Sequence, residues 1–203
     1  MGAIVLEEIP VQRLEGTEAF FHSARSLDFT VANYWQWSAS NLLDNTARGI
    51  LSEFIVASAL GVAGGTRSEW DSFDLITDEQ VRVEVKSAAY IQRWQQKVFS
   101  PISFDIGRKM GWDPKTGTAT FVARHSEVYV FCLLSHKDQA TLNILDLNQW
   151  EFFVLATAKL DRRFGNQKSL RLNPLRKMSP IFATYPELAA AVRLEGSAAS
   201  LTQ

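Results

Sequence analysis

Apolar and polar positions alternate with a period of two over residues 81–88. Such alternation predicts a β-strand, because successive side chains of a strand point to opposite faces of a sheet. A turn-forming stretch at 78–80 precedes this strand and predicts a hairpin with a shorter strand at 73–77. Other apolar runs predict further strands, at about 127–134, 141–146, 152–156 and 169–172.

The clearest helical pattern covers about residues 46–60, where apolar residues recur with helical spacing. Asn45 or Thr46 can cap its start, and Gly61 suits the left-handed position after its end. Glu53 falls beside apolar residues of this helix, so we expect it to have a partner, because burying a lone carboxylate is costly. Weaker patterns predict helices at 17–27 and 186–194, and a helix or an irregular segment at 33–43.

These elements predict an α/β protein with a central mixed β-sheet flanked by helices. We expect a single domain over residues 1–194, with its core at about 46–156 and a disordered tail at 195–203. Residues 97–120 are rich in proline and glycine and predict a long loop or flap.

The composition places the chain among globular proteins. Of its 203 residues, 46% are hydrophobic and 21% are charged, which is close to the ordinary globular share. No apolar run is long enough to span a membrane, and no basic leader opens the chain. Cys132 lies in an apolar run and is expected to be a core thiol. We therefore expect a cytoplasmic protein without a membrane partner.

The near-neutral net charge hides an asymmetry along the chain. Residues 1–92 contain six Lys and Arg against thirteen Asp and Glu, whereas residues 93–177 contain fourteen against seven. An acidic half that holds a carboxylate cluster, joined to a basic half, favours a metal-dependent enzyme that acts on a polyanion. The alternative is an ordinary fluctuation of charge along the sequence.

Three charged residues gather on the predicted hairpin. Asp74 lies in the first strand, and Glu84 and Lys86 share one face of the second. Such a cluster needs a counterpart, and Mg²⁺ is suited to it because this ion prefers oxygen ligands and binds through one or two carboxylates plus substrate phosphate. The alternative for Glu84 and Lys86 is an ion pair on an exposed sheet, which contributes little stability.

In this order and context, Glu53, Asp74 and Glu84-Val85-Lys86 resemble the PD-(D/E)xK nuclease superfamily, which has the restriction-endonuclease-like fold. The resemblance covers roughly residues 46–134. It implies an endonuclease that requires Mg²⁺ or Mn²⁺, held by Asp74, Glu84 and the Val85 carbonyl. Glu53 would hold a metal-bound water or a second ion, and Lys86 would orient or deprotonate the attacking water.

One position departs from the family pattern, because Phe73 stands where many members have proline. Asp71 competes with Asp74 for the first carboxylate position. Asp74 is preferred because its distance along the chain from Glu84 suits a tight hairpin and its neighbours resemble core residues. The three histidines are scattered, and no His or Cys cluster indicates zinc.

Candidate contacts to nucleic acid follow the motif strand. Gln92 is one by analogy with related nucleases, although a solvated turn is the alternative for it. The others are basic side chains that can bind phosphates without reading sequence. They are Arg108, Lys109, Lys115, Arg162, Arg163, Lys168 and Arg171.

The sequence therefore predicts a Mg²⁺- or Mn²⁺-dependent endonuclease acting on nucleic acid, with DNA as the expected substrate in restriction, defence or repair. Specificity would come from a homodimer or a partner subunit, since no separate reading domain is visible. The first alternative is a non-catalytic nuclease-like module that binds nucleic acid or a partner protein. The second is a generic α/β domain in which the motif is accidental and its residues do not converge.

Overall fold

The computed structural model describes residues 6, 9–67, 71–113 and 118–200. Contacts between Cα atoms divide the chain into two compact units, where the sequence predicted a single domain over 1–194. The smaller unit contains residues 1–40 and 64–67, and the larger contains 41–63 and 68–203. In the described part of the chain, no helix has both the length and the apolar character that a membrane crossing needs.

The smaller unit is built around a β-hairpin and a helix. Strand β1 (Ala19–His22) pairs antiparallel with β2 (Arg25–Thr30), and helix α1 (Val31–Ala39) follows directly. The helix predicted at 17–27 is therefore wrong. Ser23 and Ala24 form the turn with φ angles of 47° and 62°, and such a turn matches the twist of paired strands. Neither is glycine or asparagine, so the sequence lacked the usual hairpin signal.

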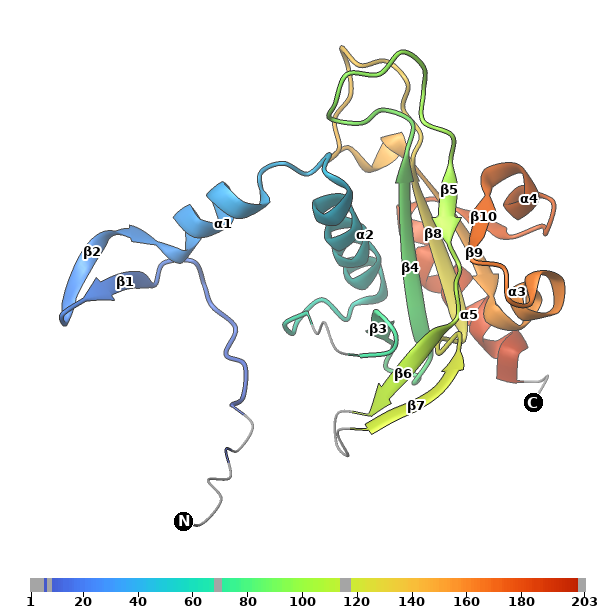
Figure 1. The fold of residues 1–203 in the computed structure, drawn as a ribbon, viewed down its shortest axis with the longest axis horizontal. Helices are drawn as coiled ribbons and strands as arrows, with labels where there is room; N and C mark the ends of the chain where they lie inside the picture. Colours follow the sequence, from blue (N-terminus) through green and yellow to red (C-terminus); the bar gives the residue numbers. More distant parts are fainter. Residues whose placement is uncertain (1–5, 7–8, 68–70, 114–117, 201–203) are drawn as a thin grey trace. The chain divides into compact units, whose positions relative to one another are not determined.

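The larger unit contains the central sheet, in the strand order β11-β9-β8-β4-β3 (Figure 1). Strands β4 and β8 are parallel, and the other neighbours are antiparallel, so the sheet is mixed as predicted. The strands are β3 (Leu75–Ile76), β4 (Arg82–Ala89), β8 (Val128–Leu134), β9 (Trp150–Ala156) and β11 (Ile181–Ala183).

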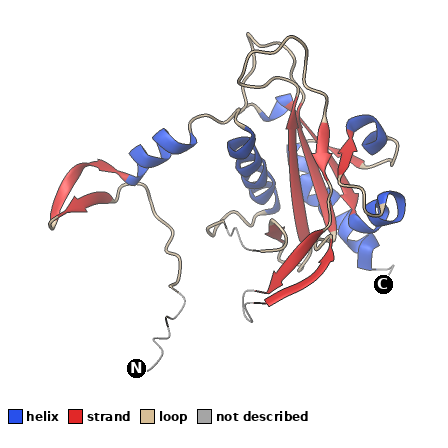
Figure 2. Ribbon diagram, in the orientation of Figure 1, coloured by secondary structure: helices blue, strands red, loops and turns tan. Residues whose placement is uncertain are grey.

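Helices cover both faces of this sheet (Figure 2). One core layer packs α2 (Asn45–Leu60) and α5 (Leu188–Ser200) against it. The other layer contains residues of α3 (Thr157–Phe164), α4 (Leu172–Arg176) and a small sheet of β5 (Ser103–Asp105) with β10 (Ser169–Arg171). The predicted α/β class with a helix-flanked mixed sheet is confirmed.

Helix α2 matches its predicted range closely. Asp44 caps it by accepting a hydrogen bond from the Thr46 N–H at 3.0 Å, and Gly61 ends it at a φ of 77°. Its buried side includes Ser52, Ile55 and Val56. Glu53 therefore lies at the edge of the buried face, where its side chain is partly exposed.

Two segments of the larger unit also differ from the sequence predictions. Residues 141–146 form turns instead of a strand, and the Ile144 carbonyl accepts a hydrogen bond from the Trp150 indole at 3.0 Å. The stretch 97–120, predicted as a loop, contains β5 and a hairpin of β6 (Lys109–Asp113) with β7 (Thr118–Ala123).

The C-terminal helix α5 continues through residues 195–200, which were predicted as part of a disordered tail. Glu195 ties it to the sheet by accepting hydrogen bonds from Ala156 N–H at 2.8 Å and Lys159 Nζ at 2.7 Å. Gly196 permits close packing, since a Cβ there would lie 3.0 Å from a methyl of Val81.

Candidate active site

Strand β4 presents Glu84 and Lys86 on one face and Val83 and Val85 on the other. The two valines belong to the core under α2 and α5. Glu84 is in register with Tyr129 of β8, and Lys86 is in register with Phe131. Both aromatic rings belong to the opposite core layer, so the charged pair points toward the side covered by α3 and α4.

Asp74 lies along the edge of β4 that pairs with β3, immediately before that short strand. Its N–H donates to the Val83 carbonyl at 3.1 Å, and its Oδ2 accepts from the Val85 N–H at 2.6 Å. The N–H and C=O of one strand residue point to the same edge. The Val85 carbonyl therefore also points toward the Asp74 side of β4, away from β8.

Two lysines bind the carboxylate of Glu84. Lys86 Nζ lies 2.5 Å and Lys109 Nζ lies 3.0 Å from its Oε1. The Glu84 side chain is only 4% exposed, whereas Lys109 is 52% exposed. Burial of this charge is tolerated because both cations lie within ion-pair distance of it.

The ionisation of Asp74 shows that the carboxylates influence each other. Burial raises the pKa of Asp74 to about 6, and the negative charge of Glu84 adds to this effect. Lys86 and the Val85 N–H oppose it, while the charge of Glu53 raises the pKa further. Glu53 on α2 is thus close enough to act on Asp74. Asp74, Glu84 and Lys86 therefore lie together at β4, and Glu53 acts on Asp74 from α2 through its charge.

Two further residues contact this cluster. Burial and the charge of Glu84 raise the pKa of Tyr129. Burial alone would lower the pKa of Lys109, but attraction to Glu84 and their hydrogen bond outweigh it, so the pKa is raised. Lys109 was predicted only as a phosphate contact, and Tyr129 was not singled out. Both positions depend on how distant strands pair, which the local sequence does not encode.

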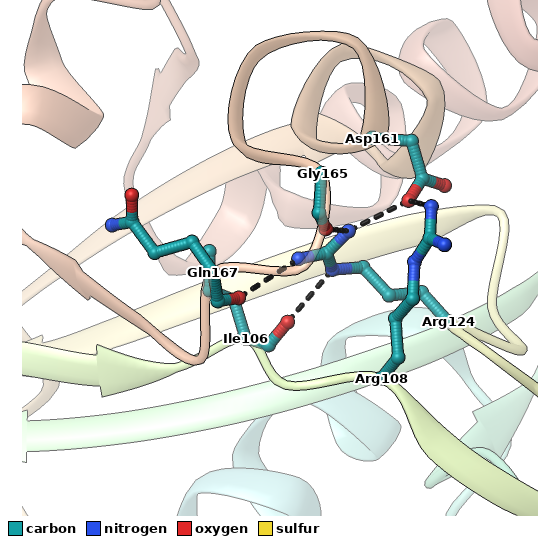
Figure 3. Close-up of polar contacts among 6 residues, drawn as sticks. All are labelled: Ile106, Arg108, Arg124, Asp161, Gly165 and Gln167. Atoms are coloured by element: carbon teal, nitrogen blue, oxygen red, sulfur yellow. Dashed lines mark hydrogen bonds and ion pairs between the residues drawn. The ribbon is translucent and has the colours of Figure 1, made fainter.

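The hairpin that carries Lys109 is fastened by Arg124, which follows β7 (Figure 3). The guanidinium donates to the Ile106 carbonyl at 2.7 Å, to Asp161 Oδ1 at 2.6 Å and to the Gly165 and Gln167 carbonyls at 2.9 and 3.1 Å. Its side chain is fully buried. Arg124 therefore joins the base of the β6–β7 hairpin to α3 and the loop after it.

The donor set suits a hard divalent cation. Asp74, Glu84 and the Val85 carbonyl offer oxygens, the ligands that Mg²⁺ and Mn²⁺ favour. Among the described residues, no three His, Cys, Asp or Glu side chains are grouped closely enough to hold an ion by themselves. A cation here would therefore also need the Val85 carbonyl, water or substrate oxygens, which is the usual situation for Mg²⁺.

The remaining predicted contacts lie in different settings. Gln92 is 8% exposed, and its amide accepts from Arg48 at 3.2 Å and donates to the Ala89 carbonyl at 2.9 Å, so it is occupied inside the protein. Arg108 forms an ion pair with Asp161 at 2.9 Å. Lys115 lies outside the described residues. The other basic candidates, Arg162, Arg163, Lys168 and Arg171, are exposed.

Comparison with known proteins identifies the family. The family model described as bacteriophage T4 endonuclease IV matches residues 24–173, which is more than two thirds of the chain and includes the whole cluster around β4. No curated protein and no solved structure matches the chain significantly. The chain belongs to the bacteriophage T4 endonuclease IV family, a family of nucleases.

Proposed function

We propose that this protein is a Mg²⁺- or Mn²⁺-dependent endonuclease that hydrolyses phosphodiester bonds in DNA, with an active site of the PD-(D/E)xK type. The observation that carries the proposal is that Asp74, Glu84 and Lys86 lie together on β4, at its edge away from β8, in a chain of an endonuclease family. The restriction-endonuclease-like fold and a role in restriction, defence or repair are parts of the same proposal.

Each residue of the proposed active site has a separate role in the reaction. Asp74, Glu84 and the Val85 carbonyl would hold the cation, and Glu53 would hold a water or a second ion. When bound, the cation supplies positive charge to the phosphate and lowers the pKa of a bound water. Lys86, anchored by Glu84, orients the attacking water and stabilises the charge that develops on the phosphate oxygens. Lys109 reaches the same carboxylate from the hairpin and is placed to contact the substrate phosphate.

The non-catalytic module is the second candidate, and one feature favours it. Glu84 is already neutralised by two lysines, and its cluster with Asp74 lacks a third close carboxylate among the described residues. Such a site could bind an anionic backbone without a cation. In that case, Mn²⁺ would show no specific affinity for the protein.

Cleavage of supercoiled plasmid tests the proposal, with Mg²⁺, Mn²⁺ or EDTA. Asp74→Asn, Glu84→Gln and Lys86→Ala should each abolish nicking. Glu151→Gln is the matched control, because Glu151 is a partly exposed carboxylate of β9 that forms an ion pair with Arg176. Loss of a surface ion pair changes the unfolding free energy by about 0–1 kcal/mol. Cleavage in EDTA, or full activity of Lys86→Ala, would refute the assignment. Single-stranded DNA and RNA tested in parallel would define the substrate.

A further inference from the structure

A basic pocket of about 750 Å³ lies between α3 and α4, apart from the carboxylate cluster. Four cationic side chains line it, together with the apolar side chains of Phe164 and Met178, and no carboxylate does. The cations are Lys159, Arg162, Arg163 and Lys177.

Three of these cations lack a protein partner. Lys159 is held by Glu195, with its Nζ 2.7 Å from Oε1. By contrast, the side chains of Arg162, Arg163 and Lys177 make no hydrogen bond or ion pair with any residue that the structure describes. Like charges gathered at one place repel each other unless an anion joins them. The pocket therefore has the electrostatic character of an anion site.

The pocket lies on the same side of the sheet as the catalytic cluster. Leu160 of α3 and Leu175 of α4 belong to the core layer toward which Glu84 and Lys86 point. A different core layer packs α2 and α5 on the opposite side. An extended ligand bound at the cluster can thus reach α3 without passing around the sheet.

Cations also line the region between the two places. A second pocket of about 480 Å³ is lined by Arg108, Lys109 and Lys168 together with one carboxylate, Asp105, and Lys109 is the residue that contacts Glu84. Arg108 pairs with Asp161, which belongs to α3 and also binds Arg124 (Figure 3). Basic side chains thus occur at the carboxylate cluster, at the base of the β6–β7 hairpin and on α3, and Arg108 and Lys109 among them are paired with carboxylates.

We propose that the pocket between α3 and α4 binds the sugar-phosphate backbone of the substrate nucleic acid, away from the bond that is cleaved. This inference rests on the proposed function, because it takes the β4 cluster as the place of cleavage. A ligand that contacts guanidinium and ammonium groups beside apolar walls is bound by phosphates and sugars, so the pocket positions the strand without reading bases. Helix α3 has eight residues and spans about 12 Å, which is enough to contact more than one phosphate of a strand.

The test compares long and short substrates with the full chain. Arg162→Ala/Arg163→Ala removes two exposed arginines from α3, and alanine preserves the helix. For a DNA of about 20 nucleotides, the double variant should bind about ten-fold more weakly in EDTA, and each lost contact should reduce the slope of log affinity against log salt by about 0.7–0.9. Cleavage of the long DNA should fall similarly, whereas cleavage of a tetranucleotide should equal that of the wild type.

The single variant Arg163→Ala is compared with Arg193→Ala as its matched control, because Arg193 is an exposed arginine on α5, which packs on the opposite face. The inference would be overturned if Arg193→Ala weakened DNA binding as much as Arg163→Ala does. It would also be overturned if the double variant lost as much cleavage on the tetranucleotide as on the long DNA, or if its DNA affinity and salt slope were unchanged. Unchanged binding with normal cleavage would leave the proposed function intact. If no substrate were cleaved, the binding and salt measurements would still decide the role of the pocket.

Discussion

The fold holds the carboxylate of Asp74 in a place that disfavours its negative charge. Burial and the charge of Glu84 raise its pKa from 3.8 to about 6. An acid with a raised pKa in the native state destabilises that state once it ionises. A carboxyl group with a raised pKa that lowers the stability of the native state is typical of a functional site, where ligand binding depends on the same charge.

We therefore expect Asp74→Asn to stabilise the protein at pH 8 while it abolishes cleavage. Each pKa unit corresponds to about 1.4 kcal/mol, so the gain in unfolding free energy is up to about 3 kcal/mol. The gain should shrink as the pH falls through 6 and disappear below 3.8, where Asp74 is neutral in both states. Urea unfolding at several pH values measures it.

The control for this experiment is Asp71→Asn, which changes an exposed carboxylate three residues earlier in the chain. It should alter the unfolding free energy little at any of these pH values. A destabilised Asp74→Asn at pH 8 would contradict the electrostatic account, because the amide can still accept the hydrogen bond from Val85. Equal gains at pH 8 and pH 3.5 would also contradict it, since the charge would then not be the cause.

Lys109 would compete with the proposed cation for the oxygens of Glu84, since its Nζ lies 3.0 Å from Oε1. Lys109→Met should therefore bind Mn²⁺ more tightly in calorimetry. The same variant should cleave DNA more slowly at saturating Mn²⁺, because a phosphate contact is lost. Lys137→Met is the control, because Lys137 lies over the Tyr90 ring in another loop. Weaker Mn²⁺ binding by Lys109→Met would show that Lys109 supports the cation site instead.

Among the elements, the hairpin β6–β7 places Lys109 beside Glu84, and the hydrogen bonds of Arg124 hold the base of this hairpin. We expect Arg124→Met to lower the unfolding free energy by about 3–5 kcal/mol, because it leaves Asp161 and three backbone carbonyls without this fully buried donor. Arg108→Met is the matched comparison, since Arg108 binds the same carboxylate oxygen but is 36% exposed. That variant should cost about 0–1 kcal/mol.

Chemical denaturation of both variants measures these differences. Arg124→Lys adds a further control, since it keeps the charge but lacks the forked guanidinium that bridges four acceptors. We expect it to recover only part of the lost stability. Equal losses for Arg124→Met and Arg108→Met would mean that the hairpin is held by contacts other than the Arg124 cluster.

The elements that sequence patterns predicted best are those whose local pattern and tertiary role agree. Strand β4 alternates because one of its faces bears Glu84 and Lys86, and β8 is a continuous apolar run because both of its faces are covered. Hairpin β1–β2 was missed because its turn uses Ser23 and Ala24 at positive φ, which the residue types do not indicate.

The residues of the candidate site also divide into those that a local sequence pattern indicates and those that only tertiary structure brings to the site. Asp74, Glu84 and Lys86 were accessible to sequence reasoning, because strand periodicity alone places them at one position of a hairpin. Lys109 and Tyr129 join them only through the pairing of β4 with β8 and the placement of the β6–β7 hairpin. Gln92 illustrates the reverse case, in which a plausible polar contact proves to be occupied by Arg48 inside the fold.

At the scale of the whole molecule, both core layers consist of residues from the larger unit. The catalytic cluster and the basic pocket lie in this unit as well. A chain shortened to residues 41–203 should therefore fold cooperatively and retain cleavage of DNA. Circular dichroism during thermal unfolding and the plasmid assay measure the two expectations.

Removal of residues 174–203 should have the opposite effect, although these residues lie beyond the family match at 24–173. This segment includes β11 and α5, which contribute fully buried Leu188 and Val192 to the core. Loss of each such large apolar side chain costs about 2–5 kcal/mol, so the joint loss of these two is comparable to the whole stability of an ordinary domain. The shortened chain should show no cooperative unfolding and no cleavage. If it folded and cleaved DNA, the layer under α5 would be dispensable, and the core of the enzyme would be confined to the matched residues.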